Sequence, residues 1–66
     1  MTEDEKELLK MWIANAQIRI ENDLTEARSD FQRNENAWFA FRLALVSERK
    51  NFLDNLVAQL YALLKV

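Results

Sequence analysis

The chain contains neither glycine nor proline among its 66 residues. These two residues mark most tight turns and interrupt most regular elements, so their absence favours long, uninterrupted elements. Strong helix formers dominate, and no alternating run of β-branched residues of the kind that predicts a strand is present. The sequence therefore predicts an all-α protein in which long helices are joined by few turns.

The first helix is predicted over residues 3–32. Thr2 is followed three residues later by Glu5, a spacing typical of a capping box at a helix start. Apolar residues then recur at steps of three or four: Leu9, Ile13, Ala16, Ile20, Leu24, Ala27 and Phe31. This spacing places them on one face of a helix, which is expected to pack against the rest of the chain.

The polar segment 32–36 follows this pattern and predicts the connection to a second helix over residues 36–65. Asn34 tolerates the left-handed conformation that ends many helices, and either Asn34 or Asn36 can cap the next helix. A break at Asn22-Asp23 is the alternative, which we discount because the apolar pattern crosses it without a change of phase. We therefore expect residues 1–66 to form one antiparallel helical hairpin.

The second helix carries two apolar stripes that lie one residue out of phase. The Trp38 stripe consists of Trp38, Phe41, Leu45, Arg49, Phe52, Leu56, Leu60 and Leu63. The Phe39 stripe consists of Phe39, Leu43, Val46, Lys50, Leu53, Val57, Tyr61 and Leu64. We assign the Trp38 stripe to the contact with the first helix, which leaves the Phe39 stripe uncovered.

An uncovered stripe of this length predicts an oligomer. A chain this short buries a small core and has no cysteine for a disulfide, so idealised helix packing or association is the expected source of further stability. The predicted interface consists of the apolar residues Phe39, Leu43, Val46, Leu53, Val57, Tyr61 and Leu64. The simplest product is a homodimeric four-helix bundle, and parallel and antiparallel dimers both bury the stripe. The alternative is that the first helix bends and covers both stripes within one chain.

Two ion pairs are predicted between the helices. Arg49 lies within the Trp38 stripe, and Arg42 lies seven residues earlier, so each guanidinium needs a carboxylate nearby. For a turn near residue 35, antiparallel packing places Asp23 opposite Arg49 and Asp30 opposite Arg42. We expect these pairs to fix the register of the hairpin.

The residue types needed for most enzyme chemistry are missing. The chain has no histidine, cysteine or glycine. It therefore lacks the commonest general base, the best nucleophile, the usual zinc ligands and the familiar phosphate-binding loops. We expect no enzymatic activity, no cofactor, no bound metal and no small-molecule substrate. No motif of a known family is recognisable.

The leading hypothesis is a cytoplasmic protein-protein interaction or regulatory module, with itself as partner and Met11 and Ile18 as a candidate contact with another protein. The first alternative is a nucleic-acid-binding regulator that uses Arg28, Arg33 and Lys50 with Arg42, although the net charge of −2 argues against it. The second alternative is binding to a membrane surface through the amphipathic segment Phe52 to Val66.

Overall fold

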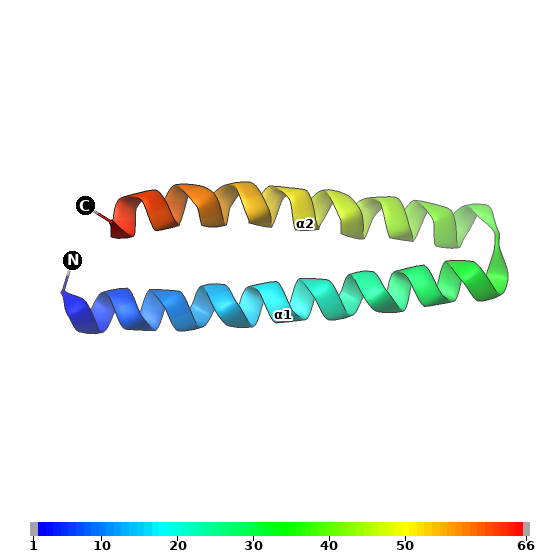
Figure 1. Ribbon diagram of the computed structural model, residues 1–66. Helices are drawn as coiled ribbons and strands as arrows, with labels where there is room; N and C mark the ends of the chain where they lie inside the picture. The colour runs from blue at the N-terminus through cyan, green and yellow to red at the C-terminus, as the bar shows by residue number, and fades with distance from the viewer. Residues whose placement is uncertain (1, 66) are drawn as a thin grey trace.

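The computed structural model describes residues 2–65, which form two long helices packed side by side (Figure 1). Helix α1 spans Glu3–Asn34 and helix α2 spans Ala37–Leu64. The helices run in opposite directions, so the start of α1 and the end of α2 lie at the same end of the hairpin. The predicted all-α helical hairpin is confirmed, and α1 does not break at Asn22-Asp23.

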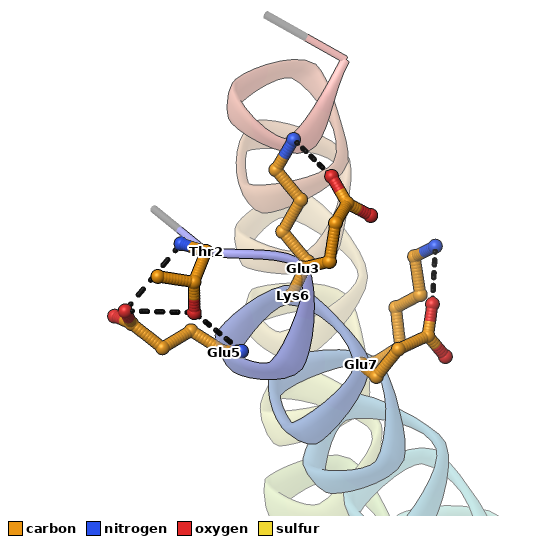
Figure 2. Close-up of polar contacts among 6 residues, drawn as sticks. Thr2, Glu3, Glu5, Lys6 and Glu7 are labelled. Atoms are coloured by element: carbon orange, nitrogen blue, oxygen red, sulfur yellow. Dashed lines mark hydrogen bonds and ion pairs between the residues drawn. The ribbon is translucent and has the colours of Figure 1, made fainter.

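The start of α1 is fixed by the predicted capping box, which is drawn in Figure 2. The Thr2 hydroxyl accepts a hydrogen bond from the Glu5 backbone N–H at 3.2 Å, and the Glu5 carboxylate accepts one from the Thr2 N–H at 3.4 Å. Glu3 pairs with Lys6 and Glu7 with Lys10, each at 3.4 Å. These carboxylates lie near the positive end of the helix dipole and stabilise the first turns.

The turn contains two residues, Glu35 and Asn36. Glu35 is the C-cap of helix α1, and its N–H donates the last hydrogen bond of the helix, to the Phe31 carbonyl at 2.8 Å. Helix α2 begins with Asn36 as its N-cap, whose side-chain oxygen accepts a hydrogen bond from the Phe39 N–H at 3.2 Å. Asn34 is the last residue of α1 rather than a left-handed cap, and its amide donates to the Asp30 carbonyl at 3.1 Å. The helix thus continues two residues beyond the predicted end.

The core is a thin seam between the helices. Its centre is the cluster of Leu24, Ala27 and Val46, with Ile20 and Leu43 packed against it. The predicted stripe of α1 faces α2 throughout, because each of its seven residues is buried or half-buried. The radius of gyration is 15.2 Å, whereas a compact domain of this length has about 11 Å. The hairpin is therefore a rod with little interior.

The prediction for the two stripes of α2 is wrong, because the structure has them reversed. Val46 and Val57 of the Phe39 stripe are buried against α1, and all the other residues of that stripe except Tyr61 are half-buried. The Trp38 stripe lies outside, and all of its residues except Leu60 are exposed. The Phe39 stripe suits the seam because Val46 is small enough to lie close to Ala27, which is 1% exposed.

Candidate interaction surface

The main candidate site is the exposed apolar row along α2. Its large side chains are Trp38, Phe41, Leu45, Phe52, Leu56 and Leu63, which are between 39% and 71% exposed. Together they present roughly 700 Å² of apolar surface, estimated from the full areas of such side chains. This exceeds the 300–600 Å² or so of the largest patch on a typical monomer. Exposure of this extent, on an extended hairpin, is typical of a partner-binding surface.

The row follows one face of α2, because its six members lie 3, 4, 7, 4 and 7 residues apart, each step close to one or two full turns. At the turn end, the Trp38 and Phe41 rings form a tilted pair with centroids 6.5 Å apart. Midway along the row stands Arg49, which is exposed and has no ion-pair partner among residues 2–65. The surface therefore has apolar halves on either side of one free guanidinium.

An ion-pair network shows which flank of α1 borders this row. Arg42 binds Asp30 at 2.5 Å and also lies 3.8 Å from the Glu26 carboxylate. Arg42 lies three residues before Leu45 on α2, so the row and the two carboxylates share one side of the hairpin. The structure thus brings together Asp30 and Arg42, as the sequence predicted.

Further along the same flank of α1 lies a shallow groove. It is lined by Trp12, Asn15, Ala16, Arg19, Ile20 and Asp23 of α1 and by Leu53 of α2. Trp12 is 62% exposed, and both Arg19 and Asp23 are exposed. No ion pair involves Arg19 or Asp23 within the described part of the chain. Asp23 and Arg49 do not meet, because Arg49 belongs to the stripe that faces outward rather than toward α1.

The basic residues considered for nucleic-acid binding are divided between different surfaces. Arg28 and Lys50 line one groove, together with Glu21, Leu24 and Thr25. The Lys50 amine donates a hydrogen bond to Asp54 at 2.8 Å, and this bond, with the charge of Asp54, raises the pKa of Lys50 above its usual 10.5. Arg33 donates to the Ser29 hydroxyl at 2.9 Å, and Arg42 is bound to the acids on the opposite flank. These four cations do not form one patch.

Met11 and Ile18 are exposed on α1, at 62% and 58% respectively. They lie seven residues apart and therefore share one side of the helix. Two side chains form a small spot compared with the row along α2. The structure leaves both accessible to a partner.

Residues 2–65 hold no group of three or more acidic side chains placed to bind one metal ion. Neither α1 nor α2 has a stretch long and apolar enough to cross a membrane. Comparison with known proteins finds no matching family model and no curated protein or solved structure with significant similarity to the chain.

Proposed function

We propose that the protein is a non-enzymatic interaction module that acts as a homo-oligomeric helical bundle. The observation that supports this proposal best is the exposed apolar row on α2, which no other part of the hairpin covers within residues 2–65. A standard interface removes about 800 Å² from each partner, close to what this row and Trp12 together present. The hairpin of a second copy would supply the buried apolar area that a single 66-residue chain lacks.

Solution mass tests the proposal directly. Light scattering on a size-exclusion column, at several protein concentrations, is expected to give at least twice the chain mass of 7.8 kDa. The paired substitution Phe41→Gln with Phe52→Gln should shift the protein toward the monomer, because it removes one exposed aromatic side chain from each half of the row. A wild-type monomer at all concentrations would contradict the proposal.

A matched control is available on α1. Met11→Gln with Ile18→Gln also removes two large, exposed apolar side chains, of nearly the same exposure as Phe41. This variant should retain the wild-type mass, because the two residues lie off the row. Met11 and Ile18 are then free to contact a second, different protein, which the oligomer would regulate by contact.

The nucleic-acid alternative has weaker support. Arg28 and Lys50 share a groove, yet Glu21 lines the same groove and Asp54 binds the Lys50 amine. Binding to DNA or structured RNA through these cations would weaken steeply as salt is added. A gel shift at low salt that Arg28→Gln abolishes would favour this alternative, and no shift is expected.

A further inference from the structure

The spacing of residues in the Trp38 stripe, which contains the exposed row, is symmetric about its centre. The steps between successive residues of the Trp38 stripe are 3, 4, 4, 3, 4, 4 and 3, which read the same from either end. An antiparallel copy of α2, related by a two-fold axis between residues 50 and 51, therefore presents the same row in register. A stripe whose steps differ when read from the other end would lose its register when it is reversed.

The pairs created by this axis match in chemistry. Trp38 meets the partner's Leu63, Phe41 meets the partner's Leu60, and Leu45 meets the partner's Leu56. Trp38 and Phe41 each lie against a leucine of the partner rather than against another aromatic ring. Large side chains therefore pack against smaller ones along the contact. Apolar side chains contact apolar side chains over both halves of the row.

The central pair gives a role to the unpaired Arg49. In the same register Arg49 lies beside the partner's Phe52, and Phe52 is 71% exposed in the hairpin. A guanidinium over the face of an aromatic ring makes a favourable cation–π contact. The two-fold axis forms this contact twice, on either side of the centre.

The charged flank of α1 fits the same axis. The observed pair of Asp30 with Arg42 places residues 21 and 22 of α1 level with residues 50 and 51 of α2. A two-fold axis there brings Arg19 nearly level with the partner's Asp23, and Asp23 nearly level with the partner's Arg19. Both side chains are exposed and lack an ion pair within residues 2–65. Opposite charges therefore meet across the interface.

Other arrangements fit poorly. A parallel α2–α2 contact places Arg49 against the partner's Arg49, which is a like-charge contact. Packing of α2 on the partner's α1 would place the Phe41 and Leu45 half of the row against the flank that carries Glu26 and Asp30, and so bury charge against apolar surface.

We infer that the row on α2 is covered by a second copy of this chain in antiparallel orientation, with α2 on α2 and the two-fold axis between residues 50 and 51. This inference rests on the proposed function, since it assumes a homo-oligomer, and it adds the occupant's orientation and register. Arg19 with the partner's Asp23, and Arg49 with the partner's Phe52, determine the orientation.

Cysteine cross-linking tests the register, because the chain has no cysteine of its own. Leu45→Cys and Leu56→Cys proteins are prepared separately, mixed, and treated with a short bis-maleimide. The mixture is expected to give covalent dimers, whereas each protein alone gives few, because its two cysteines lie 11 residues apart along the interface, about 16 Å.

The outcomes separate this inference from the proposed function. Cross-linking of Leu45→Cys alone shows a parallel contact and overturns the inference, although the oligomer stands. A light-scattering dimer that does not cross-link in the mixture shows that α2 does not face α2 in this register, and also overturns the inference. A monomer by light scattering overturns both proposals.

A charge-reversal pair tests the contact between the two α1 helices. Asp23→Arg leaves two cations on this flank, and Arg19→Asp leaves two acids, so each variant alone should dimerise about tenfold more weakly than wild type. Mixing them should restore association, because only the mixed dimer places the two cations of one variant beside the two carboxylates of the other. Equal dimerisation of each variant alone and in the mixture would overturn the inferred orientation.

Discussion

The two apolar stripes of α2 have the same period, yet they have different environments in the hairpin. The Phe39 stripe contains the two buried residues of α2, Val46 and Val57. The Trp38 stripe contains the larger aromatic side chains, and its Phe52 is the most exposed of them. The bulkier stripe is thus the one that remains outside, so apolar content alone does not determine which face of a helix becomes core.

What distinguishes the stripes is their fit to α1. The seam offers small side chains such as Ala27, to which Val46 packs closely, whereas the Trp38 stripe carries the longer Leu45 at this level of α2. The two stripes also differ in the burial of the one cation that each contains. Lys50 lies half-buried beside the seam and extends to Asp54 on its own helix, whereas Arg49 remains in solvent. Packing and charge therefore select the same stripe for the core.

The largest difference between the two stripes is expected when an aspartate is introduced at neighbouring positions, one in each stripe. Val46→Asp places a charge in the seam, where Val46 is 6% exposed, and should cost several kcal/mol, comparable with the whole stability of a small domain. Leu45→Asp places the same charge on the row and should weaken association while the helices persist. Circular dichroism with light scattering checks both variants. Equal loss of helix in both, at high protein concentration, would show that the two faces contribute alike to folding.

The turn offers a smaller test, because the point where α2 begins sets which stripe faces α1. Asn36→Ala removes the acceptor for the Phe39 N–H and should cost about 1 kcal/mol, or roughly 4–8 °C in the melting temperature. Asn36→Gly should cost only a few tenths of a kcal/mol. Asn34→Ala is the control, since Asn34 is helical and alanine has the higher helix propensity. A larger loss from Asn34→Ala than from Asn36→Ala would contradict the observed cap.

The ion pair at the edge of the seam should contribute less. A double-mutant cycle with Asp30→Ala and Arg42→Ala is expected to give a coupling energy of about 0.5–1 kcal/mol, because both side chains retain contact with water. The same cycle on Asp23 and Arg49 should give a coupling close to zero, since these residues do not meet in the hairpin. Urea unfolding measures both cycles, and similar coupling in the two would favour the register with the Trp38 stripe inside.

The sequence predicted much of this fold because local signals agreed with one another. The capping box at Thr2 and Glu5, the apolar face of α1 and the polar turn each depend on residues close in the chain. The choice between the stripes of α2 depends on how closely two helices approach, which no local spacing records. The small residue Ala27 opposite Val46 was the available signal. The candidate surface was therefore expected on the wrong face, although a surplus apolar face was expected.

The smallest expected effect is a change in the pKa of Lys50, the cation of the Phe39 stripe. The hydrogen bond from Lys50 to Asp54 raises the pKa of Lys50, so the folded hairpin holds this proton more tightly than the unfolded chain does. The resulting stabilisation is fully present below pH 10.5 and is lost as the pH rises through the raised pKa. Asp54→Asn should move the pKa of Lys50 back toward 10.5, as an NMR titration of the Lys50 side chain would show. An unchanged pKa in this variant would mean that Asp54 is not the cause, and that the lysine is held beside the seam by packing of its methylene chain.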